Sequence, residues 1–186
     1  MKKALLFLAD GFEEVEALAP LDILRRAGIN LLTVSVTGQK TVKSSHQVVI
    51  EADIRLEELS VEQAEADVYI LPGGMPGSQT LADCQPLHNL LLQANANGKW
   101  IAAICAAPMV LGKLGLLAGK EAICYPGVES KLEGARISDQ AVVKDSKVIT
   151  AKGVGVAFDF GYAILKELAD AETVEQLKAQ MIYTNK

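Results

Sequence analysis

The cysteine of the stretch IAAICAAP, Cys105, is the residue whose position most directly suggests chemistry. It stands where an apolar run over 100–105 meets a helix expected over 106–117. The positive end of a helix favours a thiolate, so we expect a lowered pKa and a thiol suited to nucleophilic or oxidation chemistry. A buried strand-end cysteine, packed as a small hydrophobe, is the alternative that position alone leaves open.

The glycine-rich segment LPGGMPG, residues 71–77, offers backbone groups rather than side chains. Glycine reaches conformations that other residues avoid, so its N–H groups can turn toward a ligand. The amides of Gly74 and Ala106 are predicted to form an oxyanion hole opposite the Cys105 thiol. A plain turn is the alternative, because many α/β loops have this composition.

Three glutamates, Glu13, Glu14 and Glu16, fall in the opening turns of a helix expected over 13–27. Helix capping and the helix dipole account for two of them. Glu16 lies between two apolar residues in a stretch that packs against the sheet, so burial would raise its pKa and suit it to proton transfer beside the thiol. A solvated helix face is the alternative.

Other chemical patterns are weaker. The loop KGVG at 152–155 lacks both the Walker spacing and a dinucleotide fingerprint, so we expect no nucleotide cofactor. Both histidines, His46 and His88, precede Cys105, which leaves a Cys-His-acid hydrolase without an obvious base. We expect His88 on a helix surface and His46 in a loop.

The elements that position these residues alternate along the chain. Short apolar runs predict buried strands, and longer amphipathic segments between them predict helices. This alternation indicates a parallel sheet with helices on both faces, in which ligands bind beyond the carboxyl ends of the strands. The predicted strands are 4–9, 31–36, 67–71, 100–105 and 147–150, and the predicted helices are 13–27, 86–97, 106–117, 156–169 and 172–182.

The boundaries of the first helix have local signals. Asp10 is predicted to cap it, with Glu13 in the capping-box position, and Gly28 marks its end. Pro20 removes one hydrogen-bond donor inside this helix, which predicts a kink. The segment 37–55 has turn residues between short alternating runs and predicts a small antiparallel excursion at the edge of the sheet.

Composition sets the class of protein. A chain of 186 residues is expected to form one domain over 1–186, and half of its residues are apolar. The net charge of -5 argues against nucleic acid or an anionic membrane surface as a partner. The apolar run after the first two lysines is too short for a signal peptide or a membrane span.

The three cysteines, Cys84, Cys105 and Cys124, have no zinc-like spacing and cannot all pair. We therefore expect free thiols, a reducing cytoplasmic location and no metal site.

Taken together, four segments resemble the DJ-1/PfpI superfamily, and within it the DJ-1 branch. They are DGFEEVEALAPLDILRRAGI at 10–29, YILPGG at 69–74, AAICAAP at 102–108 and KGVGVAFDFGYAIL at 152–165. The resemblance implies a flavodoxin-like three-layer α/β sandwich, mostly parallel, and a homodimer that packs partly through the first helix.

The resemblance also implies roles for individual residues. Cys105 is expected to be the reactive cysteine, Glu16 to form a hydrogen bond to its sulfur, and Gly74 and Ala106 to supply the oxyanion-binding amides. Tyr125 stands where many members of the branch carry a histidine that is drawn as the proton shuttle. Tyrosine is a poorer base at neutral pH, although its hydroxyl can still donate a hydrogen bond or orient a substrate.

Three functions follow from this resemblance. The first is a cofactor-independent glyoxalase or deglycase that acts on 2-oxoaldehydes such as methylglyoxal or on their protein adducts. The second is a redox-sensing or chaperone-like stress protein that responds through oxidation of Cys105 to a sulfinate. Peptidase or amidotransferase action is the weakest, because the triad histidine is missing.

Overall fold

The centre of the molecule is one seven-stranded sheet, seen in a computed structural model that describes residues 1–184. Its strand order is β10-β11-β7-β6-β1-β2-β5, and within the described chain every neighbouring pair is parallel except β10 with β11. The strands are β1 (Lys3–Leu8), β2 (Asn30–Ser35), β5 (Ile54–Arg55), β6 (Val68–Leu71), β7 (Trp100–Ile104), β10 (Val142–Asp145) and β11 (Val148–Ala151). This is the predicted flavodoxin-like α/β sandwich.

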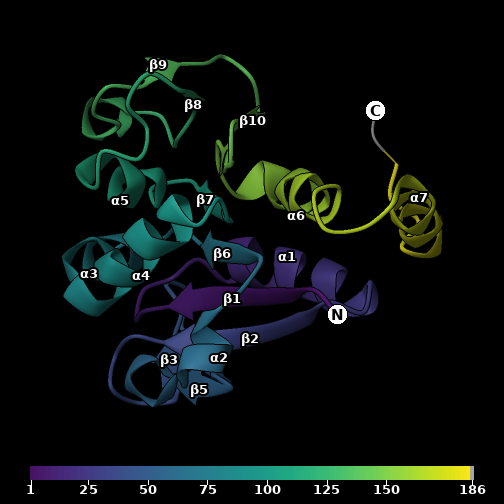
Figure 1. Cartoon of the computed structure of the whole chain (residues 1–186), viewed down its shortest axis with the longest axis horizontal. Coiled ribbons are helices and arrows are strands. Elements are labelled where there is room, and N and C mark those ends of the chain that lie inside the picture. Colours follow the sequence, from purple (N-terminus) through teal and green to yellow (C-terminus); the bar gives the residue numbers. More distant parts are fainter. Residues whose placement is uncertain (185–186) are drawn as a thin grey trace.

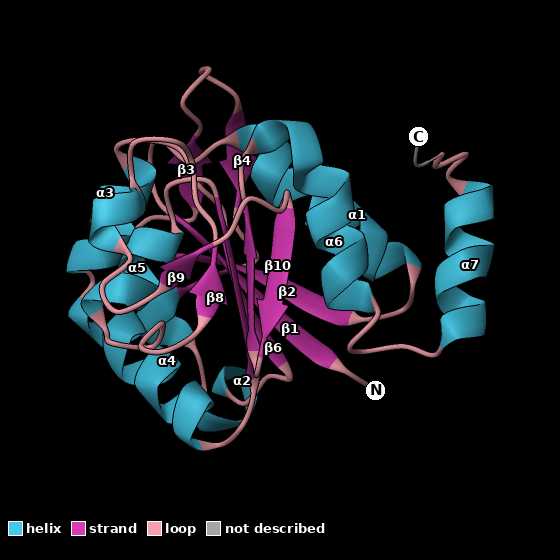
Figure 2. Ribbon diagram, turned by 90° about the horizontal axis from the view of Figure 1, so that it is seen from above, coloured by secondary structure: helices cyan, strands magenta, loops and turns pink. Residues whose placement is uncertain are grey.

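Helices cover both faces of the sheet (Figure 1). Helices α1 (Glu14–Arg26), α6 (Ala157–Leu165) and α7 (Ala171–Gln180) lie on one side, with α7 outermost, as Figure 2 shows. Helices α3 (Gly77–Asp83), α4 (Gln85–Ala96) and α5 (Pro108–Lys113) lie on the other, and the short α2 (Val61–Ala64) precedes β6. Figure 2 therefore shows the three layers edge on.

Each face of the sheet has its own hydrophobic core. Along β1, Leu6 and Leu8 pack with the cluster that includes α1 and α6, whereas Leu5 and Phe7 pack with the cluster of α3, α4 and α5. Alternate strand residues point to opposite faces, so a strand buried on both sides reads as a continuous apolar run. This explains why the runs in the sequence predicted the central strands.

The smaller elements lie outside the main sheet. Strands β3 (Thr41–Lys43) and β4 (Val49–Glu51) form an antiparallel pair, which confirms the predicted excursion, and β8 (Glu121–Ala122) pairs with β9 (Arg136–Ile137). The short 3-10 helices are Leu56–Glu58, Glu129–Lys131 and Val154–Val156.

The first helix is capped differently from the prediction. Asp10 does not cap it, because its Oδ1 accepts the Lys43 N–H at 2.9 Å. Glu13 is the N-cap, and its Oε2 accepts the Glu16 N–H at 2.7 Å. The helix continues through Pro20 and ends at Arg26, and Gly28 marks its end as predicted, with a left-handed φ of 75° just after the C-cap residue Ala27.

Helix α5 is shorter than the predicted 106–117. Gly115 takes a left-handed φ of 69°, and the Leu116 N–H returns to the Leu111 carbonyl at 3.0 Å. This is a glycine-based C-terminal motif, which satisfies carbonyls at the end of a helix and stops it. The helix is correspondingly limited to Pro108–Lys113.

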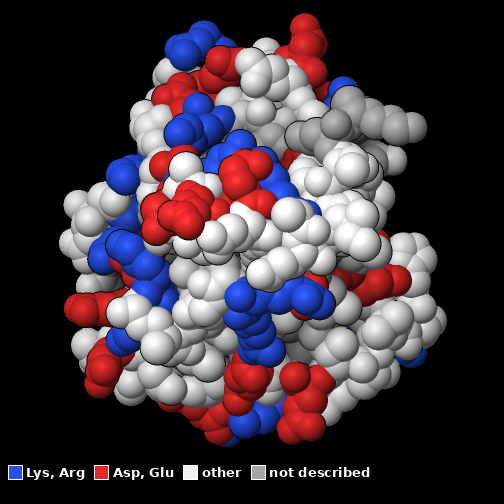
Figure 3. All heavy atoms as spheres, turned by 90° about the vertical axis from the view of Figure 1, so that its right-hand side faces the viewer, with Lys and Arg blue, Asp and Glu red and all other residues white. Residues whose placement is uncertain are grey.

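The distribution of surface charge and the length of the helices are relevant to binding of nucleic acid or membranes. On the face that carries α7, positive and negative side chains are interspersed over the described residues, and they do not gather into one basic area (Figure 3). Among the described residues, no helix is both long enough and apolar enough to cross a membrane.

Candidate active site

Cys105 lies directly after β7, at the carboxyl end of the parallel sheet. Its φ is 64°, in the left-handed region that non-glycine residues rarely occupy and that costs on the order of 1–3 kcal/mol. Two neighbouring segments hold this conformation, since the Cys105 N–H donates to the Ala151 carbonyl at 2.9 Å and its carbonyl accepts the Tyr125 N–H at 2.8 Å. Such a sharp strand-to-helix turn lifts a nucleophile out of the backbone around it.

Glu16 is the acid that faces this thiol. Its side chain is 0% exposed although it carries a carboxyl group, and its Oε2 accepts the Gly73 N–H at 2.9 Å. Oε1 has no hydrogen-bond partner among the residues that the structure describes. The Cys105 side chain lies close enough to the Glu16 carboxyl for each group to shift the pKa of the other. The predicted meeting of these two residues is therefore present, and the alternative of a solvated Glu16 is wrong.

The absence of a side chain at Gly73 allows Glu16 and Cys105 to approach each other. A Cβ at this position would lie 2.5 Å from the Cβ of Cys105 and 2.5 Å from Oε2 of Glu16. Distances this short exclude any side chain, so the backbone itself fills the space between the acid and the thiol. Gly74 was predicted at the site from the sequence and Gly73 was not; the paired glycines of LPGGMPG were the available signal.

The protonation states of the pair are linked. Burial raises the pKa of Glu16 to about 7, against the hydrogen bonds from Cys105 and Gly73 that favour the carboxylate. Burial, followed by the charge and hydrogen bond of Glu16, raises the pKa of Cys105 to about 12. Two negative charges side by side are unfavourable where water is largely excluded, so above the pKa of Glu16 the carboxyl is charged and the Cys105 sulfur keeps its proton.

This result corrects the expectation that a helix end lowers the pKa of Cys105. The N–H groups of Gly74 and Ala106 do donate toward the sulfur and favour the thiolate. Their effect is smaller than that of burial and the neighbouring carboxylate, and α5 itself begins only at Pro108. The structure thus brings both predicted amides to the thiol.

Tyr125 contacts Cys105 through its backbone N–H, which donates to the Cys105 carbonyl, and the residue is 53% exposed. A Cβ at Gly153 would touch its ring at 3.4 Å, so the ring lies against the loop after β11. Tyr125 and this loop line a cavity of about 230 Å³. The cavity is lined by Tyr125, Pro126, Lys152, Gly153, Val154, Gly155 and Val156.

The other two cysteines lie elsewhere. Cys124 is buried, as expected, and burial together with Glu129 raises its pKa to about 11. Cys84 is half-buried at the junction of α3 and α4, where burial raises its pKa. All three thiols are free, which confirms the prediction.

The histidines are both outside the site. His46 is an exposed loop residue, as expected, and its Nδ1 lies 3.0 Å from Oε1 of Glu14. His88 is only 5% exposed, so its predicted place on a helix surface is wrong; α4 turns it inward, and its ring nitrogen lies 3.3 Å from the Leu81 carbonyl.

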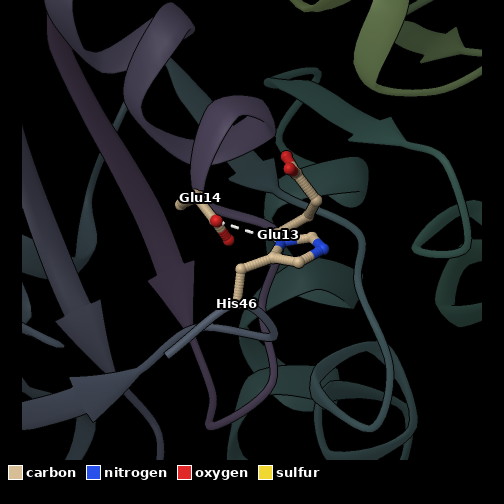
Figure 4. A group of neighbouring side chains, drawn as sticks. All are labelled: Glu13, Glu14 and His46. Carbon is tan, nitrogen blue, oxygen red and sulfur yellow. Dashed lines mark ion pairs between the residues drawn. The ribbon is translucent and has the colours of Figure 1, made fainter. Parts of the chain in front are cut away.

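One group of side chains has donors of the kind that bind metals. Ligand atoms of Glu13, Glu14 and His46 lie within 4.8 Å of one another, and Figure 4 shows Glu14 and His46 turned toward each other. Glu13 already caps α1, and Glu14 is already paired with His46. These two interactions account for the cluster, and no metal role is assigned to it.

The fold and the site define a class of protein: an α/β sandwich with a cysteine on a strained turn, paired with a buried glutamate from the first helix. The profile of the DJ-1/PfpI family matches residues 2–167, and the chain belongs to this family.

Individual relatives agree with this assignment. Protein dj-1beta of Drosophila melanogaster is 39% identical over 95% of this chain and 94% of its own length. Glutathione-independent glyoxalase DJR-1.2 of Caenorhabditis elegans is 34% identical over 95% of this chain and 94% of its own length. The structure of oxidized Toxoplasma gondii DJ-1 superposes with a TM-score of 0.93, at 33% identity, and the match covers 100% of both chains.

Proposed function

We propose that this protein is a cofactor-independent glyoxalase that converts small 2-oxoaldehydes such as methylglyoxal into hydroxy acids. The observation that carries the proposal is the pairing of the buried Glu16 carboxyl with the partly exposed Cys105 thiol, which places a group that can transfer protons beside a nucleophile. The relative named as a glutathione-independent glyoxalase supports the same choice.

The reaction begins with transfer of the Cys105 proton to Glu16. The thiolate attacks the aldehyde carbon, so that a C–S bond forms and the carbonyl electrons move to oxygen as the hemithioacetal develops. The N–H groups of Gly74 and Ala106 are proposed to hold this oxygen, because both already donate toward the sulfur.

Glu16 then moves protons between carbon and oxygen. It removes the hydrogen from the former aldehyde carbon and returns a proton to the neighbouring carbon, which leaves a thioester beside a new hydroxyl group. Water hydrolyses the thioester, releasing the hydroxy acid and the free thiol. The aldehyde carbon is oxidised and the ketone carbon is reduced, so no external oxidant, metal or organic cofactor takes part.

The same chemistry can act on a protein adduct. When an amino group or thiol of another protein has added to a 2-oxoaldehyde, the Cys105 thiolate displaces it at the same carbon and the later steps are unchanged. This is deglycase activity, and the partly exposed position of Cys105 is compatible with the larger substrate.

We also propose that the protein is a homodimer that packs through α1 and acts in the reducing cytoplasm. Val15, Leu18 and Phe158 are exposed apolar residues on α1 and at the start of α6. They line one shallow hollow of about 290 Å³ together with Glu14, Ala19 and Asp22. Clustered exposed apolar side chains of this kind mark interaction surfaces.

The proposal is tested by the conversion of methylglyoxal to lactate. We expect Cys105→Ser to lose at least about 100-fold in kcat/KM, because a hydroxyl is a far weaker nucleophile than a thiolate. Cys84→Ser is the matched control and should keep the activity of the unmodified protein. If Cys105→Ser turns over methylglyoxal as fast as the unmodified protein, the enzymatic proposal is wrong.

A second candidate function is redox sensing. Cys105 is partly exposed, and Glu16 in its neutral form can donate a hydrogen bond to an oxidised sulfur. Two equivalents of hydrogen peroxide would convert the thiolate first to sulfenate and then to sulfinate, with one water released at each step. Intact-mass analysis after mild peroxide tests this: Cys105 should gain two oxygens before Cys84 or Cys124 reacts.

A further inference from the structure

The segment 121–125 lies against the main sheet beside Cys105, although it is not one of the strands of that sheet. Its first two residues form β8, which pairs with β9 in a separate two-stranded sheet. Ala122, Ile123 and Cys124 are nevertheless buried. Contacts other than strand pairing therefore hold this segment in place.

Two alternate backbone N–H groups of the segment supply the contacts nearest to the thiol. The Ile123 N–H donates to Oγ1 of Thr150 at 3.0 Å, and this hydrogen bond is buried. The Tyr125 N–H donates to the Cys105 carbonyl at 2.8 Å. In an extended chain, groups two residues apart point the same way, so the contact at Ile123 directs the N–H of Tyr125 toward Cys105.

A third contact, at the start of the segment, is more accessible to water. The Glu121 N–H donates to Oδ2 of Asp145 at 2.8 Å, and the Asp145 side chain is 28% exposed. Thr150 is only 1% exposed. Water can replace the carboxylate of Asp145 as an acceptor, whereas loss of the Thr150 hydroxyl would leave a buried N–H group without one.

Thr150 also connects the two backbone partners of Cys105. It directly precedes Ala151 on β11, and the Ala151 carbonyl accepts the Cys105 N–H at 2.9 Å. These two partners hold Cys105 at its left-handed φ of 64°. The next residue, Ala106, directs its N–H toward the sulfur and so favours the thiolate. A change in the turn would therefore move this donor away from the sulfur.

We propose that Thr150 is a positioning residue for Cys105. Its hydroxyl fixes the segment 121–125, and through the Tyr125 N–H this segment holds the turn that directs the Ala106 N–H at the sulfur. The inference rests on the proposed function in taking the Cys105 thiolate as the reacting group. Thr150 acts through other residues, because its buried side chain is not accessible to a substrate.

Alkylation by iodoacetamide tests the positioning without any enzymatic turnover. The thiolate displaces iodide as the S–C bond forms. The quantity measured is the ratio of the alkylation rate at Cys105 to that at Cys84 in the same molecule, read by mass spectrometry of the two peptides. Cys84 lies at the junction of α3 and α4, so it serves as an internal reference for the reagent and the pH.

We expect Thr150→Val to lower this ratio about three- to tenfold, as partial loss of a hydrogen bond to a charged sulfur implies. Valine is similar in size to threonine but has no hydroxyl group. Thr150→Ser keeps the hydroxyl and should restore most of the ratio. An unchanged or higher ratio in Thr150→Val would overturn the proposal, and so would a Thr150→Ser variant that reacts like Thr150→Val.

Thr33→Val is the matched control. Thr33 is a buried threonine on β2, and its Oγ1 accepts the Asp53 N–H at 2.8 Å. Strands β6 and β1 lie between β2 and β7, so this hydroxyl is remote from the thiol. Both valine variants should lose stability in urea, but Thr33→Val should keep the alkylation ratio. An equal fall of the ratio in the two variants would show that it follows stability, which contradicts a positioning role.

Turnover of methylglyoxal gives the second arm. In Thr150→Val, kcat/KM should fall by the same factor as the alkylation ratio, since both depend on the Cys105 thiolate. A lower ratio with an unchanged kcat/KM would contradict the proposed function, because the thiolate would then take no part in turnover, and would support the role of Thr150. Failure of the glyoxalase proposal and failure of the positioning role thus give different results.

Discussion

Glu16 is completely buried beside Cys105, and the interaction of their side chains connects the first helix to the residue that follows strand β7. The two groups titrate as a pair, since the charge on either one raises the free energy of charging the other. Four predictions follow from this pair, from the glycine beside it and from the exposed face of α1.

Replacing Glu16 should change both the pKa of the Cys105 thiol and the rate of the proposed reaction. In Glu16→Gln the carboxylate that raises the pKa of Cys105 is absent, so that pKa should fall from about 12. The kcat of the proposed glyoxalase reaction should nevertheless fall by about 10²–10⁴, because the group proposed to move protons is missing. The pH dependence of iodoacetamide alkylation measures the first effect and lactate formation the second; an unchanged thiol pKa would contradict the coupling.

Stability should depend on pH through Glu16. Its folded pKa is raised to about 7 from 4.5, so between these values the unfolded chain releases the proton first and the native state loses stability as pH rises. The loss is absent below pH ~4.5, complete above pH ~7 and on the order of 3 kcal/mol.

Urea unfolding of the unmodified protein and Glu16→Gln across this pH range checks the effect. Glutamine does not titrate, so the variant should gain stability relative to the unmodified protein as pH rises. A difference between the two that stays constant with pH would show that Glu16 has an ordinary pKa.

Gly73→Ala should lower the stability of the protein more than alanine substitution at a glycine with open space around it. The added Cβ would meet Cys105 and Glu16 at 2.5 Å each, which forces the pair apart and is expected to cost about 1–3 kcal/mol of stability. Gly155→Ala is the control for stability, since nothing lies within 4 Å of its added Cβ. Denaturant unfolding should separate the two variants; equal stabilities would mean that the backbone at Gly73 can shift freely.

The proposed dimer should dissociate when its apolar surface is charged. Leu18→Glu places a carboxylate on the exposed face of α1, and burying it against a second copy is unfavourable. Val61→Glu is the matched control, because Val61 is an exposed valine on α2. Size-exclusion chromatography with light scattering should show a monomer for Leu18→Glu alone, and a monomer for the unmodified protein would remove the dimer proposal.

The sequence predicted the architecture because the relevant signals are local. Buried parallel strands such as 67–71 are continuous apolar runs, and the rule that ligands bind beyond their carboxyl ends correctly brought Glu16 and Cys105 together. The short strands β8 and β9 have two residues each and leave no comparable pattern.

Features that depend on packing were missed. The pKa of Cys105 is set mainly by burial and by a carboxylate 89 positions away in the chain, which a local helix-end argument does not include. His88 is polar, yet the face of α4 that carries it turns inward. The need for glycine at position 73 arises from two side chains that are remote in sequence.

The left-handed turn at Cys105 is held by segments that are remote from it in the sequence. Ala151 and the segment after Cys124 hold the turn, while α1 supplies Glu16 and the loop after β6 supplies Gly73 and Gly74. None of these segments is adjacent to Cys105 along the chain, so we expect the thiol to behave as an ordinary cysteine during folding until the whole sheet has assembled. Its distinctive rate of chemical labelling should therefore be the last property to appear during refolding, and the first to be lost when any one of these segments detaches.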